Sequence, residues 1–165
     1  MTKRPIDYAK SACNTMMRKF ENPLDLPPAG NFHYHQGVFL AGMEQTYLLT
    51  ADEKYNCYIK AWIDGIINDS GVITAYDEKT LDDLRSGTLL FRILKETGNE
   101  RYEKPLHTIY NHLKNWPVNK EGGFWHKFYD KDQMWLDGLY MAGPFLAMYG
   151  ALYNKDECFD EAVLQ

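Results

Sequence analysis

The chain has 165 residues, a length that suits one domain able to bury a substantial core. Its 23 acidic residues outnumber its 18 basic residues and give a formal net charge of −5, which argues against nucleic acid as a partner. Aromatic residues make up 15% of the chain and include 12 Tyr and 4 Trp. This composition is globular and suits surfaces that stack on flat faces such as sugar rings.

Sorting signals and cysteines indicate the compartment. Residues 1–5 lead into an amphipathic segment without the apolar region of a signal peptide, and no apolar run is long enough to span a bilayer. Cys13, Cys57 and Cys158 are odd in number and widely spaced, which argues against a disulfide framework and against a zinc site. We therefore expect a soluble, cytoplasmic protein with free thiols and no membrane contact.

Apolar residues recur at helical spacing along the chain, and no segment has the period-2 alternation of a half-buried strand. The sequence therefore predicts an all-α fold. The expected helices span residues 6–20, 38–49, 50–68, 80–97, 100–116, 132–153 and 154 to near the end. Long loops separate some of these helices and tight capped turns separate others.

A weak repeat marks the tight turns. An aromatic residue follows each of them, at Tyr55, Tyr102 and Phe159, and these positions are 47 and 57 residues apart. This period exceeds that of tetratricopeptide and ankyrin repeats, about 33–34 residues, and suits helical hairpins arranged in a ring with long loops on one rim. Three hairpins do not close such a ring. We therefore expect either a longer protein or a homodimer that covers the apolar flanks.

The first candidate for catalysis is Asp137, which lies among Trp, Leu, Tyr and Met residues in an apolar segment. Burial there would raise the pKa of its carboxyl and make it a general acid near neutral pH. The alternative is a structural Asp that is hydrogen-bonded to backbone or to a Tyr hydroxyl. Asp132 lies in a more polar run, so we interpret it as the cap of the same helix.

The second candidate is Asp82. In the run from Thr80 to Asp83 a capping box would direct the Asp83 side chain back towards Thr80, which leaves Asp82 free to face elsewhere. Asp82 and Asp137 would then share a pocket at the loop ends of neighbouring inner helices, and such pairs divide acid and base roles. The alternative is that both acids merely occupy the first turn of a helix.

The loop 122–127 combines aromatic rings with an imidazole and a cation. His126 and Lys127 would suit a sugar carboxylate, and Trp125 or Trp135 a ring face; the alternative for His126 is a solvated loop histidine. The cluster at residues 32–35 lacks matching carboxylate or Cys spacing, so we expect no metal site. Nucleotide-binding and nucleophile-elbow fingerprints are absent from the sequence.

These motifs match a family pattern. The runs Gly122–Lys127 and Gln133–Ala142 closely resemble the unsaturated rhamnogalacturonyl hydrolases of glycoside hydrolase family 105, and Leu81–Gly87 and His33–Gly37 are similar to earlier motifs of that family. The resemblance implies an (α/α)6 barrel of about twice this length. Residues 1–165 would supply the N-terminal half of one catalytic domain that is truncated on its C-terminal side.

The resemblance also implies a reaction. The family removes a 4,5-unsaturated galacturonyl residue from rhamnogalacturonan-derived disaccharides by hydrating the vinyl ether double bond, after which rhamnose is released. Asp137 matches the family's acid/base, and Asp82 matches the second carboxylate. The positions that line the substrate pocket are matched by Tyr34, His126, Lys127 and Trp135. No cofactor and no metal are implied.

Two alternatives stay open. An unsaturated glucuronyl hydrolase acting on glycosaminoglycan fragments would share fold and reaction. A catalytically inert helical fragment that binds sugar or protein would bind the saccharide without consuming its double bond.

Overall fold

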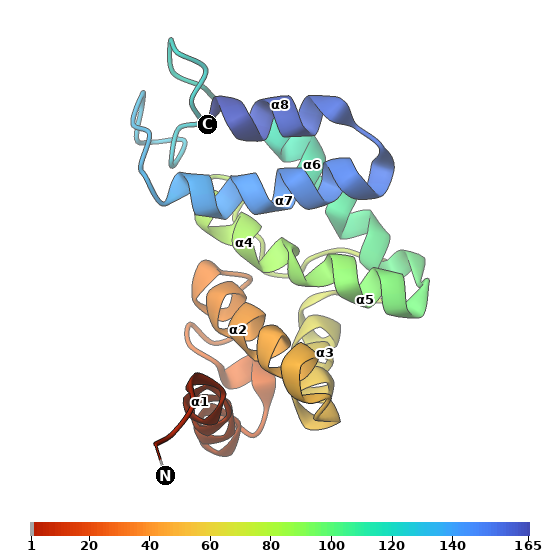
Figure 1. The fold of residues 1–165 in the computed structure, drawn as a ribbon. Coiled ribbons are helices and arrows are strands. Elements are labelled where there is room, and N and C mark those ends of the chain that lie inside the picture. The colour runs from red at the N-terminus through yellow and green to blue at the C-terminus, as the bar shows by residue number, and fades with distance from the viewer. Residues whose placement is uncertain (1) are drawn as a thin grey trace.

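The computed structural model describes residues 2–165 and is built from helices (Figure 1). Over these residues β-pairing occurs only as isolated bridges. The α-helices are α1 (Pro5–Lys19), α2 (Tyr34–Thr50), α3 (Glu53–Ile66), α4 (Leu84–Gly87), α5 (Leu89–Thr97), α6 (Glu103–Lys114), α7 (Gly138–Tyr153) and α8 (Asp156–Leu164). The short 3-10 helices are η1 (Pro23–Asp25), η2 (Leu81–Asp83) and η3 (Glu100–Tyr102). None of the described helices is long and apolar enough to cross a membrane.

The helices form three hairpins, which confirms the repeat. Helix α2 is followed by α3, the pair α4 and α5 by α6, and α7 by α8. Each hairpin turns at a residue in the left-handed conformation that ends a helix: Ala51, Gly98 and Asn154, with φ of 53°, 62° and 52°. The aromatic residue after the turn is buried at Tyr55 and Tyr102 but 40% exposed at Phe159.

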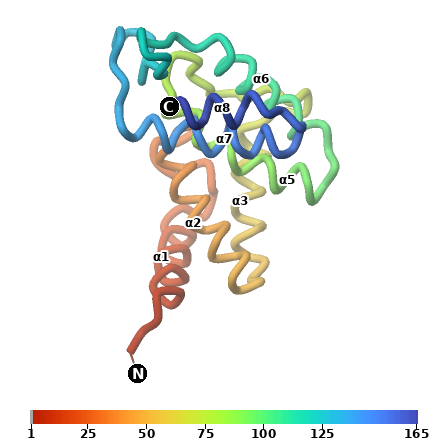
Figure 2. The backbone as a smooth tube through the Cα atoms, turned by 45° about the horizontal axis from the view of Figure 1, so that its top comes forward, coloured from red at the N-terminus to blue at the C-terminus, as the bar shows by residue number. Residues whose placement is uncertain are grey.

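Helix α4 lies between α2 and α7, and the long loops that precede these helices gather at one end of the molecule (Figures 1 and 2). A Cβ atom on Gly37 of α2 would lie 2.8 Å from the backbone nitrogen of Ser86, so only glycine permits this approach. The Ser86 hydroxyl also donates a hydrogen bond of 2.7 Å to the carbonyl oxygen of His33. These contacts fix the start of α2 against α4.

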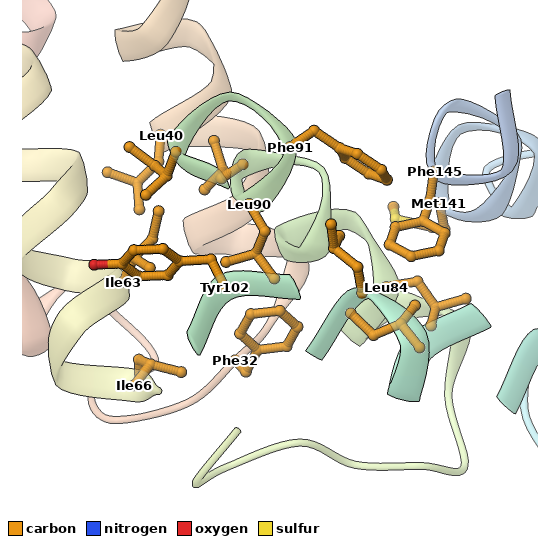
Figure 3. Packing of buried hydrophobic residues seen from close by; sticks show 14 of the residues in the cluster. Phe32, Leu40, Ile63, Ile66, Leu84, Leu90, Phe91, Tyr102, Met141 and Phe145 are labelled. Atoms are coloured by element: carbon orange, nitrogen blue, oxygen red, sulfur yellow. The ribbon is translucent and has the colours of Figure 1, made fainter. Parts of the chain in front are cut away.

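One continuous apolar core links the hairpins (Figure 3). Leu40 and Ile63 pack on one side of it, Leu84 and Leu90 in the middle, and Phe145 on the side of α7. At the two flanks, apolar side chains of α2 and α7 are exposed to solvent: Val38, Leu48, Leu49, Leu139, Met148 and Leu152.

Three helix boundaries differ from the expectations. The helix expected at 38–49 begins at Tyr34, and the helix expected at 80–97 is interrupted at Thr88. The helix expected at 132–153 begins only at Gly138, because Asp132 has a positive φ of 60° and the backbone after it bonds to a neighbouring loop. The interpretation of Asp132 as a helix cap is therefore wrong, since Asp137 occupies the N-cap position of α7.

Two glycines of α2 provide a test of this packing. We expect Gly37→Ala to lower the free energy of unfolding by about 1–3 kcal/mol, because the new methyl group would collide with the backbone of Ser86. Gly42→Ala is the matched control: no atom lies within 4 Å of its Cβ position, so helix propensity should stabilise the fold by about 0.5–1 kcal/mol. Urea unfolding measures both effects. If both substitutions changed the free energy of unfolding by the same amount and in the same direction, this result would contradict the described contact between α2 and α4.

Candidate active site

The site is assembled by a short stretch of backbone pairing between two loops. The backbone nitrogen of Leu81 donates to the carbonyl oxygen of His126 at 3.1 Å, and that of Phe128 donates to the carbonyl oxygen of Lys79 at 3.0 Å. Thr80 and Lys127 form the antiparallel bridge between these two bonds. Since Asp82 follows directly, the pairing brings its carboxylate next to the loop that carries the imidazole.

A second contact connects this loop to the start of α7. The backbone nitrogen of His126 donates to the carbonyl oxygen of Gln133 at 2.8 Å. The ring of Trp135 then stacks on the His126 ring, with centroids 4.3 Å apart and planes 3° from parallel. Asp137 follows two residues later at the N-cap position of α7, so the stacked rings fix where its carboxylate lies.

The result is a cluster of one imidazole and two carboxylates. His126 Nε2 lies 3.6 Å from Asp82 Oδ1, and His126 Nδ1 lies 3.9 Å from Asp137 Oδ1. The side chains of His126 and Asp82 are only 2% and 10% exposed, whereas that of Asp137 is 50% exposed. Lys127 Nζ lies 3.8 Å from the other oxygen of Asp82. Such a set can present two acidic groups and an imidazole to one bound molecule, and Asp137 is its most solvent-exposed member.

The same three residues are the group that could hold a metal. One potential ligand atom from each of Asp82, His126 and Asp137 lies within 4.8 Å of the others, and these residue types suit zinc and similar divalent cations. His33 and His35 lie outside this group, and their Nδ1 atoms are 2.9 Å apart. The sequence-based expectation that no metal is required stays a prediction.

The expectation that Asp137 is desolvated is wrong. Its neighbours on the chain face solvent: Trp135 is 45% exposed and Leu136 is 84% exposed. The apolar residues around Asp137 follow the helical pattern of a buried segment, but most of them lie on the flank of α7 that no other described helix covers. Any role of Asp137 as an acid must therefore come from its position beside His126.

Asp83 is the carboxyl that burial affects. Burial, with smaller contributions from the charges of Asp77 and Asp82, raises the pKa of Asp83 to about 7. The Asp83 carboxylate accepts a hydrogen bond of 2.7 Å from the backbone nitrogen of Asp77, and the Thr80 hydroxyl instead accepts from the backbone nitrogen of Asp82. The capping-box interpretation of Asp83 is therefore wrong, although Asp82 does face His126 and Lys127.

The remaining expected site residues lie in different surroundings. Lys127 Nζ lies 5.7 Å from the centre of the Trp135 ring, so both are near the acid pair. His126 is buried and is not a solvated loop histidine.

Tyr34 is half-buried at the start of α2 and stacks on His35 with ring centroids 4.1 Å apart. The carbonyl of Trp125 accepts a hydrogen bond from Trp116, and of the two candidate tryptophans Trp135 is the one stacked on His126.

A cavity of about 280 Å³ opens beside Asp82. It is lined by Asn31, His33, Ala75, Asp77, Thr80, Asp82, Asp83, Lys127 and Tyr129. Sequence reasoning did not select Asn31, Asp77 or Tyr129, because each lies in a loop without a motif of its own. The sequence did indicate that the long loops gather on one rim, and this expectation could have selected loop residues such as these three.

Comparison with known proteins establishes the family. Residues 8–165 match the family model for Glycosyl Hydrolase Family 88, and the chain belongs to this family. It is 24% identical over 135 residues to the unsaturated rhamnogalacturonyl hydrolase YesR of Bacillus subtilis, covering 78% of this chain and 38% of that protein.

Solved structures agree with the fold. A glycoside hydrolase from family 105 of C. acetobutylicum is 34% identical, with a TM-score of 0.86 over 96% of this chain and 43% of that one. A possible family 105 member from Klebsiella pneumoniae is 22% identical, with a TM-score of 0.75 over 98% of this chain and 47% of that one. The predicted fold class, hairpins arranged as in an (α/α)6 barrel, is confirmed, and the chain spans less than half of these relatives.

The buried carboxyl of Asp83 predicts a pH dependence of stability. Between the pKa of an exposed Asp, about 4, and the pKa of about 7 in the fold, the native state holds a proton that the unfolded chain has lost. Stability should therefore fall as the pH rises through this window, by roughly 2 kcal/mol. Urea unfolding between pH 4.5 and 8 should show this slope in the wild type and a shallower slope in Asp83→Asn.

Asp69→Asn is the control for this experiment, because Asp69 is fully exposed and its replacement should leave the slope unchanged. Parallel stability curves for the wild type and Asp83→Asn would show that the Asp83 carboxyl does not titrate in this window.

Proposed function

We propose that this protein removes a 4,5-unsaturated galacturonyl residue from rhamnogalacturonan-derived disaccharides by hydrating the vinyl ether double bond, with release of rhamnose. The observation that carries the proposal is the close placement of Asp82 and Asp137, which have carboxylate oxygens within 4.8 Å of each other and beside the His126 ring. The similarity to YesR supports the choice of substrate. Membership of a glycosyl hydrolase family supports a reaction at a glycosidic residue.

In this proposal Asp137 is the acid and base. A protonated carboxyl at this position gives its proton to C4 of the unsaturated ring, and positive charge develops on C5 and the ring oxygen. The carboxylate left behind then takes a proton from the water that adds to C5, so the group returns to its starting state. Its half-exposed position beside His126 Nδ1 suits a group that must reach both substrate and water.

Asp82 is the second carboxylate of the proposed reaction. It is mostly buried between His126 and Lys127, so its position is fixed from two sides. From there it would accept hydrogen bonds from ring hydroxyls and orient the attacking water. This chemistry differs from the two-carboxylate displacement at the anomeric carbon, because the glycosidic bond is lost only after the hemiketal at C5 opens.

Stacking and charge would hold the sugar. The solvent-facing side of Trp135 offers a flat surface for a sugar ring while its other face rests on His126. The ammonium of Lys127 lies nearby and adds positive charge for an anionic substrate. Tyr34 is proposed as a more distant contact, since it lies at the start of α2 against His35.

Two other functions remain candidates. An unsaturated glucuronyl hydrolase would use the same acid pair, and turnover of glycosaminoglycan disaccharides in preference to rhamnogalacturonan disaccharides would identify it. A binding module without activity is favoured by one observation, that the chain spans 38% to 47% of three similar proteins. It predicts saccharide binding while the ultraviolet absorbance of the double bond stays constant.

Amide variants of the acids test the assigned roles. We expect Asp137→Asn to lower the rate of loss of the substrate's ultraviolet absorbance at least about 100-fold, because an amide cannot transfer the proton. Asp82→Asn should be severely impaired for the same readout. Circular dichroism checks that both variants keep the fold.

The matched control is Asp132→Asn, which should retain activity. Asp132 lies five residues before Asp137, and its positive φ is one that Asn also tolerates. Turnover that survives in Asp137→Asn would remove that residue from the acid/base role. Loss of activity in Asp83→Asn, but not in Asp82→Asn, would show that Asp83 and not Asp82 is the second carboxylate.

A further inference from the structure

A second cavity, of about 380 Å³, opens between α2, α4 and α7, the three helices that Figure 1 shows in a row. Half of the residues of its wall are polar or charged, and Arg85 is the one cation among them. The residues that line it are Val38, Ala41, Gly42, Glu44, Gln45, Arg85, Thr88, Tyr140, Pro144 and Met148. None of these residues lines the cavity beside Asp82.

The Arg85 guanidinium is buried without a counterion. Arg85 is 8% exposed, and it forms no ion pair with any of the described residues. Its Nη2 donates to the Tyr140 hydroxyl at 2.9 Å, its Nη1 donates to Thr88 Oγ1, and its Nε is buried without a hydrogen-bond partner. A guanidinium has five N–H donors, so several of them remain free to bind a ligand.

Arg92 shows how the same fold treats another poorly exposed arginine. The Arg92 side chain is 12% exposed and pairs with Glu44 at 2.6 Å and with Glu96 at 2.7 Å. Glu44 is also the one carboxylate on the described wall of the Arg85 cavity; it interacts with the charge of Arg85, but its ion pair is with Arg92. A buried charge without an ion pair costs free energy, so a negative group bound in the cavity would stabilise the Arg85 guanidinium.

Two residues of the cavity wall are close in sequence to the acids. Arg85 is the second residue of α4, which directly follows the 3-10 helix η2 that contains Asp82. Tyr140 lies three residues after Asp137, the N-cap of α7, or about 5 Å along that helix. The Tyr140 ring also lies under the guanidinium, with 4.5 Å between the Arg85 Cζ and the ring centre. The acids therefore lie at the starts of α4 and α7, and Arg85 and Tyr140 lie in the first turns of the same two helices.

We propose that Arg85, supported by Tyr140, binds the carboxylate of the unsaturated uronyl residue. The inference depends on the proposed function, since it assigns the part of that substrate that is negatively charged. In such a ring the carboxylate is attached to C5, adjacent to the C4 atom that takes up the proton. A group that binds this carboxylate must therefore lie close to the acid, and Arg85 is hydrogen-bonded to Tyr140, one helical turn from Asp137.

The position of the carboxylate predicts which kinetic constant changes. Positive charge develops on C5, directly beside the carboxylate, so a guanidinium there stabilises the bound substrate at least as much as the transition state. Arg85 therefore contributes to binding, and its loss should raise KM at least about tenfold with little change in kcat.

The test compares the free acid and the methyl ester of the unsaturated disaccharide. For the wild type we expect KM of the ester to exceed KM of the acid at least about tenfold, whereas Arg85→Gln should bind both forms equally weakly. Arg18→Gln, which removes an equal charge from α1, should behave like the wild type. Equal KM values for acid and ester in the wild type would overturn the proposal even if turnover is efficient.

A binding measurement separates this inference from the proposed function. Saturated galacturonate should raise the melting temperature of the wild type and of Arg18→Gln above the value in galactose with sodium chloride at equal ionic strength. Arg85→Gln should lose this difference. If galacturonate raised the melting temperature only when Arg85 is present, but the protein did not turn over the unsaturated disaccharide, the carboxylate site would be supported and the proposed reaction rejected. No difference between galacturonate and the galactose control would overturn the site.

Discussion

The candidate site depends on one short piece of backbone pairing, between residues 79–81 and residues 126–128. Asp82 lies in η2 just before α4 and Asp137 is the N-cap of α7, but neither helix supplies the imidazole beside them. The bonds from Leu81 to His126 and from Phe128 to Lys79 bring that imidazole to Asp82. The His126–Trp135 stack then extends the arrangement to Asp137. A shift of this pairing by one residue would turn the His126 side chain away from Asp82, because successive side chains point to opposite sides of an extended segment.

The fold was accessible from the sequence because its signals are local and repeated. Helical spacing of apolar residues predicted the helices, and the turns at Ala51, Gly98 and Asn154 fall where the repeat of aromatic residues placed them. Boundaries were less accessible. The run from Asp132 to Trp135 has the composition of a helix, but its backbone bonds to the loop at His126, a contact between distant parts of the chain. Such tertiary hydrogen bonds leave no periodic pattern.

The sequence predicted which residues form the site but not how buried each of them is. The sequence selected Asp82, Asp137 and His126, and the fold brings them together. It assigned burial to Asp137 and left a solvated His126 as an alternative, whereas in the fold Asp137 is half-exposed and His126 is buried. The burial of Asp83 and Arg85 also went unnoticed, because burial depends on how α4 packs between α2 and α7. The sequence therefore indicated the chemistry, and the packing determined which side chain meets solvent.

Acid and cation have complementary tasks in this account: the pair Asp82 and Asp137 acts on the double bond, and Arg85 binds the charged end of the same ring. The central claim is that the reaction is a hydration, in which C4 receives a proton that comes from solvent. An analogue of the unsaturated uronic acid that carries hydrogen in place of the leaving group at C1 tests it most directly, because it has no glycosidic bond to displace. The account predicts that the enzyme hydrates this analogue and that the ultraviolet absorbance of its double bond disappears. Constant absorbance of the analogue, under conditions in which the unsaturated disaccharide is consumed, would show displacement at the anomeric carbon and contradict the account.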